Sequence, residues 1–254
     1  MTSIKRTQNQ FGRQSRLYAS SPIHAEGESL RVLIDFAEPR AGERAADIGA
    51  GAGFTAAAIA ARGVRVVAVD PTAPMLERTR ELAAQRGLDI ALAVAQGEAL
   101  PFATGSLDLV ACRLACHHFL DLAAALREFR RVVRDGGRVA IADTVAPEDP
   151  ELDAWMNDVE LRRDPTHVRD RRPSEWRALL REAGFRIERD YTARSPQEFD
   201  VWVRRAGTPP ERIPGLRRDF ERPPAGAVEA FGITYEGDVI RWAWDNYVIL
   251  ARPA

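Results

Sequence analysis

A run of small residues, from Ala46 to Phe54 (ADIGAGAGF), has the clearest chemical meaning in the sequence. Glycines in such a turn leave the main chain bare for a ligand and tolerate the positive φ angles of a tight turn. The turn lies between a predicted strand and a predicted helix, which is the context of a nucleotide-binding loop. A dinucleotide site would need glycine three residues after Gly51, but Phe54 stands there.

The G-x-G-x-G spacing after Asp47 is instead typical of a turn that binds S-adenosylmethionine. Asp70 ends the next predicted strand, about 20 residues after Gly49, where a carboxylate can accept hydrogen bonds from both hydroxyls of a ribose. An acid at this place also suits a nicotinamide cofactor. Asp70 therefore predicts nucleoside binding, and the glycine spacing indicates which nucleoside.

Three side chains after the fourth predicted strand are candidate catalytic groups: Arg113, His117 and His118. Ligands of an open α/β sheet bind beyond the carboxyl ends of its strands, and histidine titrates near neutral pH. We favour His118 as a general base, with His117 second. Either histidine could instead shape the pocket wall, and Arg113 could orient an acidic acceptor or pair with a local carboxylate.

Cys112 and Cys116 lie beside the two histidines, which raises the question of a metal site. A zinc site would show a second cluster of ligands, and haem attachment would need C-x-x-C-H. We therefore expect no metal, and we interpret the cysteines as small buried hydrophobes. Two cysteines form no disulfide framework, which favours a reducing compartment such as the cytoplasm.

Short β-branched runs alternate with helical patterns along residues 44–142, which favours a parallel sheet with helices on both faces. We predict an α/β fold with a doubly wound, mostly parallel, seven-stranded sheet in a single domain, 1–254. Segments 1–40, 144–172 and 195–232 are predicted to form a helical lid, the last because it is rich in proline. The predicted strands are 44–48, 64–69, 90–95, 107–112, 138–142, 185–191 and 243–251, and the main predicted helices are 54–61, 74–86, 122–134, 151–162 and 174–184.

Several motifs together resemble the class I methyltransferases, in particular the group that contains the ubiquinone and menaquinone C-methyltransferases. The motifs are residues 47–53, Asp70, 96–102 (QGEALPF), 105–110 (GSLDLV) and 117–119 (HHF), and the match spans residues 15–190. Residues 18–24 (YASSPIH) also resemble the N-terminal segment that folds over the cofactor in that group.

The resemblance implies that Asp47 holds the amino group of the cofactor, while Gly49 and Gly51 pass close to it. The family usually has Asp-Ala where this chain has Gln96-Gly97; a Gln carbonyl can still accept from the adenine amino group, with less charge. Met75 would pack on the adenine or serve as an ordinary core residue. The expected cofactor-binding residues are Tyr18, Asp47, Gly49, Gly51, Asp70, Pro71, Met75, Gln96, Gly97, Glu98 and Arg113.

Composition excludes some classes of function. The net charge of −1 and the mixed charges of residues 162–172 do not favour nucleic acid, and no apolar run is long enough to cross a bilayer. Residues 1–25 hold four basic residues and no acid before Glu26, as in a transit peptide or, as we prefer, a basic N-terminal arm. The sequence leaves a homodimer open.

We expect an S-adenosylmethionine-dependent methyltransferase that acts on carbon or oxygen of a small metabolite and yields S-adenosylhomocysteine. Aromatic residues of the lid, among them Trp155, Trp202 and Trp242, could shape an apolar acceptor pocket. The alternative is a protein of the same fold that binds the cofactor without methylating.

Overall fold

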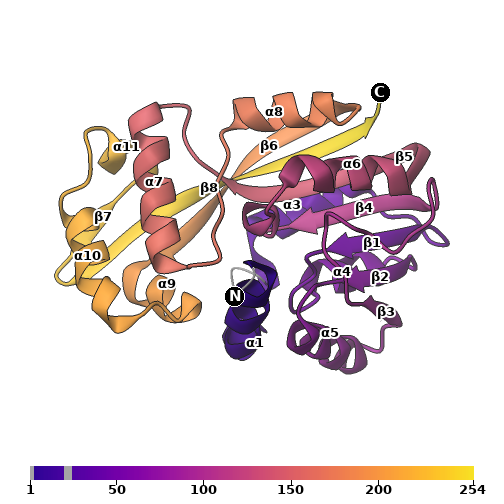
Figure 1. The fold of residues 1–254 in the computed structure, drawn as a ribbon, viewed down its shortest axis with the longest axis horizontal. Helices are drawn as coiled ribbons and strands as arrows, with labels where there is room; N and C mark the ends of the chain where they lie inside the picture. Colours follow the sequence, from indigo (N-terminus) through magenta and orange to yellow (C-terminus); the bar gives the residue numbers. More distant parts are fainter. Residues whose placement is uncertain (1–2, 20–24) are drawn as a thin grey trace.

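Eight strands form one sheet in the computed structural model, which describes residues 3–19 and 25–254 (Figure 1). The strands are β1 (Arg44–Ile48), β2 (Arg65–Val69), β3 (Ile90–Ala93), β4 (Leu107–Arg113), β5 (Val133–Val145), β6 (Phe185–Glu198), β7 (Thr234–Glu236) and β8 (Val239–Pro253). The α-helices are α1 (Ser3–Ala19), α3 (Glu28–Ala37), α4 (Phe54–Ala60), α5 (Ala73–Arg86), α6 (Leu122–Val132), α7 (Pro150–Arg163), α8 (Pro173–Glu182), α9 (Phe199–Ala206), α10 (Ile213–Glu221) and α11 (Ala227–Phe231). Short 3₁₀ turns are η1 (Cys116–His118) and η2 (Pro210–Arg212).

The strand order is β3-β2-β1-β4-β5-β8-β6, with β7 paired to β8. The five strands from β3 to β5 are parallel, and β8 runs antiparallel to both β5 and β6. This confirms the predicted doubly wound α/β sheet. The prediction of seven strands missed β7, because its three residues are all exposed and show no apolar alternation.

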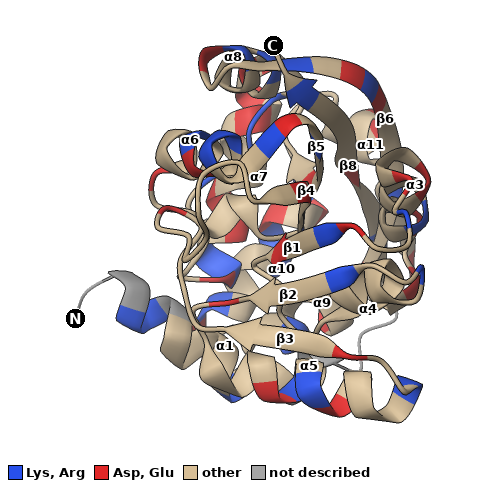
Figure 2. Cartoon of the chain, turned by 90° about the vertical axis from the view of Figure 1, so that its right-hand side faces the viewer, with Lys and Arg blue, Asp and Glu red and all other residues tan. Residues whose placement is uncertain are grey.

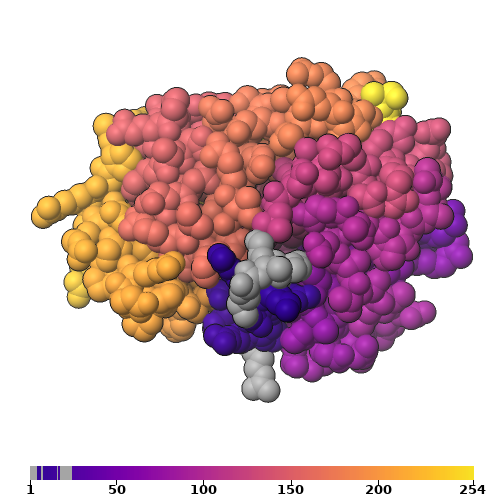
Figure 3. Space-filling model, viewed as in Figure 1, coloured from indigo at the N-terminus to yellow at the C-terminus, as the bar shows by residue number. Residues whose placement is uncertain are grey.

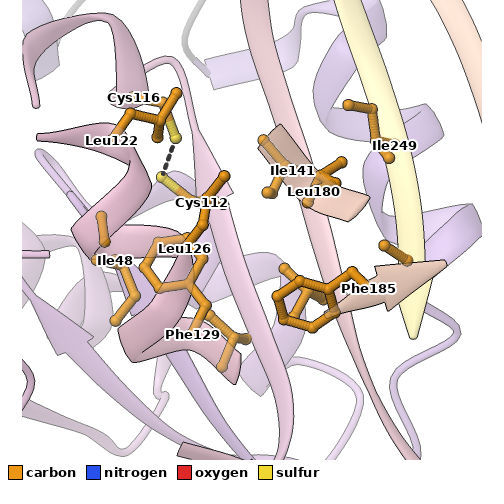
Figure 4. Close-up of a cluster of buried hydrophobic side chains, with 14 of the residues drawn as sticks. Ile48, Cys112, Cys116, Leu122, Leu126, Phe129, Ile141, Leu180, Phe185 and Ile249 are labelled. Atoms are coloured by element: carbon orange, nitrogen blue, oxygen red, sulfur yellow. Dashed lines mark hydrogen bonds between the residues drawn. The ribbon is translucent and has the colours of Figure 1, made fainter. Parts of the chain in front are cut away.

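The central strands are buried on both faces, so they read as continuous small and β-branched runs. In β4, six of the seven residues are buried. On one face, Leu122, Leu126 and Phe129 of α6 pack with Ile141 of β5 (Figure 4). On the other face, α3 packs through residues such as Leu33. Helix α3 thus belongs to the sheet layers, although the sequence pattern placed it within the lid segment 1–40.

Strands β6 and β8 are much longer than predicted, and their paired ends extend beyond the end of β5, towards the left of Figure 1. Pro196 made β6 hard to follow in the sequence, yet it pairs with Ala243 in the β6–β8 ladder. A proline lacks the N–H that an inner strand needs, and β6 tolerates it because it is the last strand of the sheet.

Helices α7, α9, α10 and α11 pack at the projecting ends of β6 and β8 around a hydrophobic core of their own (Figure 1). We refer to this region as the lid, after the sequence-based expectation. Its aromatic rings pack on one another: the ring centroids of Phe220 and Trp242 are 4.3 Å apart, and those of Phe231 and Trp244 are 4.9 Å apart. Most of the lid aromatics therefore stabilise the lid itself, while Trp202, one of the three named from the sequence, also lines the cavity described below.

Helix α1 contacts both α5 of the sheet layers and α9 of the lid. Figure 3 shows this N-terminal segment, in indigo, between the two halves. Acidic and basic residues are interspersed along α5, α6 and α8 (Figure 2). Over residues 3–19 and 25–254, none of the helices has the length and apolar character needed to cross a bilayer.

Candidate active site

The glycine turn between β1 and α4 has the conformation that its sequence requires. Gly49, Gly51 and Gly53 have φ angles of +68°, +54° and +84°. A Cβ on Gly49 would lie 2.4 Å from the Cβ of Ala115. The absence of a side chain at Gly49 thus allows close approach of residues 114–121, which follow β4 and which we call the β4 loop. A Cβ on Gly51 would meet no atom within 4 Å, and Gly51 lines the main cavity. The turn thus presents bare main chain to open space.

Asp70 lies at the end of β2 and faces the same cavity. Its Oδ2 accepts a hydrogen bond from the Gly51 N–H at 2.9 Å, and its Oδ1 accepts from the Thr72 N–H at 2.8 Å. Burial raises the pKa of this carboxyl, while the two N–H groups act in the opposite direction. Each oxygen keeps a lone pair for a ligand hydroxyl, which fits the predicted sugar-binding role.

Asp47 lies beneath the turn and is not part of the cavity wall. Its Oδ2 accepts from the Ala56 N–H at 2.9 Å, at the start of α4. Burial raises its pKa to about 7, although the nearby Arg113 guanidinium lowers it. Burial in turn lowers the pKa of Arg113 to about 10. The charge of the nearby Asp47 opposes this effect on Arg113, and the Arg113 Nε–H donates to Thr55 Oγ1 at 3.1 Å.

The segment after β3 closes the other side of the cavity with Gln96, Gly97 and Glu98. Glu98 Oε1 accepts from the Leu120 N–H at 3.0 Å, so this side chain fastens the β4 loop. A Cβ on Gly97 would lie 2.8 Å from the ring of Phe119. The packing of Phe119 therefore explains why glycine stands where the family usually has alanine.

The structure brings most of the predicted site together in one cavity. Of the predicted residues, Gly49, Gly51, Asp70, Pro71, Met75, Gln96, Gly97, Glu98, Arg113, His117 and His118 line it. The side chain of Tyr18 and the whole of His24 lie outside the described residues. Phe11 of α1 was not predicted, but it lines the cavity and places its ring 4.9 Å from that of His118.

His117 forms a tight pair with Asp143 of β5. Its Nδ1 lies 2.6 Å from Asp143 Oδ1, and its backbone N–H donates to Oδ2 at 2.8 Å. Burial alone would lower the pKa of His117, but attraction to Asp143 and their hydrogen bond raise it to about 9. His117 is therefore an imidazolium at neutral pH. Asp143 was not predicted, because it lies in β5 and is separated from His117 along the chain by helix α6.

His118 differs from His117 in its hydrogen-bond partner and in the direction of its pKa shift. Its Nδ1 lies 3.1 Å from the carbonyl oxygen of Thr166, which can only accept, so Nδ1 carries the proton and Nε2 the lone pair. Burial and then the charge of His117 lower its pKa to about 4. The two ring centroids are 4.1 Å apart. A charged and a neutral imidazole thus stand side by side.

Beyond the histidines, the cavity continues into the lid, where residues of α7, β6, α9 and the 164–172 loop line it. Trp202 of α9 was among the aromatic residues expected to shape an acceptor pocket. The polar residues here were not predicted as catalytic or cofactor-binding residues, although residues 162–172 stood out for their density of charge. The polar residues at this end are Glu160, Arg163, Asp164, His167, Asp170, Ser195, Gln197 and Arg205. We call this part of the cavity the lid end.

The two cysteines are buried in the core beneath the β4 loop, as predicted, with their sulfur atoms 3.3 Å apart (Figure 4). Burial raises the pKa of both thiols, so both are protonated at neutral pH. Within the part of the chain that the structure describes, no cluster of His, Cys, Asp and Glu has the arrangement of a metal site.

Comparison with known proteins agrees with this geometry. Residues 46–141 match the family model of a methyltransferase domain. The chain is 38% identical over 203 residues to the uncharacterized methyltransferase YcgJ of Bacillus subtilis, covering 80% of each chain. The crystal structure of that protein superposes with a TM-score of 0.82 over 89% of this chain and 97% of the other, at 34% identity.

Two further relatives define the group. A putative methyltransferase from Bacillus halodurans superposes with a TM-score of 0.84 at 30% identity, over 89% of this chain and 99% of the other. A demethylmenaquinone methyltransferase of Corynebacterium kroppenstedtii is 32% identical over 129 residues, 51% of this chain and 54% of that protein. The bare turn, the acid at the end of β2 and the shared fold have one explanation: the chain belongs to the class I S-adenosylmethionine-dependent methyltransferases.

Proposed function

We propose that this protein transfers a methyl group from S-adenosylmethionine to carbon or oxygen of a small-molecule acceptor. The observation that carries the proposal is a single cavity that joins the bare turn at Gly51 and Asp70 to the paired histidines. The described residues thus offer a cofactor end and an acceptor end with polar, titratable groups between them. The two buried free thiols suit the reducing cytoplasm.

The residues fit the cofactor at its nucleoside. Gly51 leaves room against the main chain, and Asp70 has lone pairs for two ribose hydroxyls. Gln96 lines the same cavity, and its amide oxygen can accept from the adenine amino group. When bound, the cofactor supplies an electrophilic methyl group. The protein must then align the acceptor, exclude water and handle any proton that the acceptor loses.

The histidine pair suits this last task. Held by Asp143, the His117 imidazolium can donate a hydrogen bond to an acceptor oxygen and stabilise the anion that attacks the methyl group. His118 is neutral and can take the proton through Nε2. Its low pKa makes it a weak base, so we assign the larger share of rate enhancement to His117 and Asp143. This reverses the order of the two histidines that the sequence suggested.

The test is direct. The purified protein is incubated with S-adenosylmethionine carrying an isotope-labelled methyl group and with metabolite extract from its own cells, and products are followed by mass spectrometry. We expect the label in a small molecule, together with S-adenosylhomocysteine. Cofactor that binds but is never consumed, whichever extract is offered, would instead support the alternative of a non-methylating binding protein.

A further inference from the structure

The lid end of the cavity is polar, although it is enclosed by the apolar core of the lid. It is lined in part by Trp202 and Trp244, whose indole N–H groups both donate to Glu160 Oε1, at 3.1 and 2.7 Å. Glu160 Oε2 accepts from Arg163 at 2.8 Å. Three donors hold Glu160, and the charge of Arg163 keeps its pKa at about 2 despite burial. The carboxylate of Glu160 and the indole N–H groups at the lid end are therefore already hydrogen-bonded to one another within the protein.

The carboxyl of Asp170, another polar residue of the lid end, is not held in the way that Glu160 is held. It is 1% exposed and lines the cavity, yet its Oδ1 has no hydrogen-bond partner among the described residues. A buried carboxyl oxygen without a partner destabilises a fold by roughly 1–3 kcal/mol, so such a group calls for an explanation. Burial, reinforced by Glu160 and Asp143, raises the pKa of Asp170 to about 8 although the charge of His117 opposes this. Its carboxyl can therefore both donate and accept.

The main chain around Asp170 is held firmly, so the position of its side chain is set by the fold. Asn157 of α7 accepts from the Asp170 N–H at 2.7 Å and donates to the Asp170 carbonyl at 3.1 Å. The preceding residues are held from the other side, because the N–H groups of Val168 and Arg169 donate to the carbonyl of His117, at 2.8 and 3.2 Å. The loop thus presents the unpartnered carboxyl in a fixed place.

The same asparagine orients His167. Asn157 Oδ1 accepts from the Asp170 N–H, so its contact of 3.1 Å with His167 Nε2 requires that nitrogen to be the donor. Burial lowers the pKa of His167 to about 3, which leaves the ring neutral with a lone pair on Nδ1. His167 lines the cavity beside Asp170. The lid end therefore offers a carboxyl and an imidazole acceptor on one clamped loop.

We propose that the lid end is the acceptor subsite and takes a compact, polar molecule whose hydroxyl or amino group hydrogen-bonds to the Asp170 carboxyl. The inference rests on the proposed methyl transfer and narrows its substrate class. A ligand of this kind would supply the hydrogen bond that the buried Asp170 carboxyl lacks within the described protein. A long apolar chain in this subsite would lie against the polar side chains of Glu160, Arg163 and Asp170 without hydrogen-bonding to them. The subsite therefore disfavours prenylated quinones.

The first test needs no knowledge of the acceptor. In Asp170→Ala the buried unpartnered group is removed, so Tm is expected to stay the same or to rise, and affinity for S-adenosylhomocysteine to stay within about twofold. The matched control is Asp164→Ala in the same loop. Asp164 Oδ1 accepts from the N–H and hydroxyl of Thr166, so this change is expected to lower Tm by several degrees. A Tm loss in Asp170→Ala equal to that of the control would show a structural role and overturn the proposal.

The second test uses the labelled-donor incubation with water-soluble and hexane-soluble cell extracts offered separately. We expect labelled product from the water-soluble extract, reduced about tenfold or more by Asp170→Ala. Retention of that product on a cation exchanger would identify an amine, and flow-through a hydroxyl compound. Labelled product from the hexane extract alone would overturn this inference and leave methyl transfer standing. No labelled product from either extract would contradict both the proposed methyl transfer and the proposed acceptor subsite.

Discussion

The two ends of the cavity are built in different ways. At the cofactor end, main-chain groups and two carboxylates bond over short sequence distances: Asp47 to residue 56 and Asp70 to residue 51. At the lid end, side chains from remote elements bond to one another, since Glu160 accepts from Trp202 and Trp244; next to it, His117 pairs with Asp143 in the same way. The first kind of site depends on local turns of the main chain, and the second depends on side chains that only the complete fold brings together.

The difference has an energetic side. The turn depends on backbone conformation and close approach, so its failures are steric. The lid end depends on buried charges that satisfy one another, so its failures are electrostatic and leave an uncompensated ion. Substitutions at the two ends should therefore differ in size, in pH dependence and in their effect on cofactor affinity.

The largest effect is expected for Glu160→Ala. The change removes the carboxylate that accepts from Arg163 Nη1 and from two indole N–H groups, and breaking a buried ion pair in this way lowers the free energy of unfolding by about 3–5 kcal/mol. Urea unfolding measures the loss. Glu160→Gln, which keeps an acceptor oxygen, is the control and should lose less. Equal losses would mean that shape, and not charge, holds the lid end.

The next largest effect is expected at the turn. Gly49→Ala places a methyl group against Ala115 and forces a left-handed conformation on alanine, for a combined loss of about 2–4 kcal/mol in the free energy of unfolding. Gly51→Ala shares the conformation but meets no neighbour, so the loss should be about 1 kcal/mol. Its methyl group would stand in the cavity, and calorimetry should show weakened binding of S-adenosylhomocysteine in a folded protein. A Gly51→Ala variant that binds normally would mean that the cofactor does not pass there.

The contrast between the two ends also explains what the sequence could reveal. The turn, Asp70 and the parallel strands were predicted because glycine spacing and β-branched runs express local rules. Asp143, Glu160 and Asp170 were missed because their roles arise from pairing across the fold, and no spacing encodes that. The full length of β6 was missed for a related reason: Pro196 argues against a strand unless that strand is known to lie at an edge.

A pH titration should separate the ends further. The pKa of His117 is raised to about 9 from an ordinary 6.5, so its pair with Asp143 stabilises the fold fully below pH 6.5 and ceases to do so as pH rises through 9. The associated loss is up to about 3 kcal/mol. Asp170 and Glu160 also face His117 and help to raise its pKa. In Asp143→Asn the decline of stability between pH 7 and 9 should become shallower; an unchanged slope would assign the decline to other groups.

Asp70→Ala tests the cofactor end at its most polar contact. Loss of hydrogen bonds to a charged group is expected to weaken binding of S-adenosylhomocysteine by about 1.5–3 kcal/mol, or roughly 10- to 150-fold. The variant should still fold, since the Gly51 and Thr72 N–H groups that lose their acceptor lie beside the cavity and can bond to water. Unchanged affinity, measured by calorimetry, would place the ribose elsewhere. Asp170→Ala is the matched change at the other end, where cofactor affinity should not move.

The smallest effect is expected for Gln96→Asp, which restores the acidic residue usual in the family. A charged acceptor binds an amino group more strongly than a neutral one, so affinity for S-adenosylhomocysteine should rise by about 1 kcal/mol or less, up to about fivefold. The family usually has alanine at the position of Gly97. The single substitution Gly97→Ala is nevertheless expected to destabilise this protein, because the ring of Phe119 occupies the space that the alanine Cβ would need. Weaker binding in Gln96→Asp would show that this chain orients the adenine differently from its relatives.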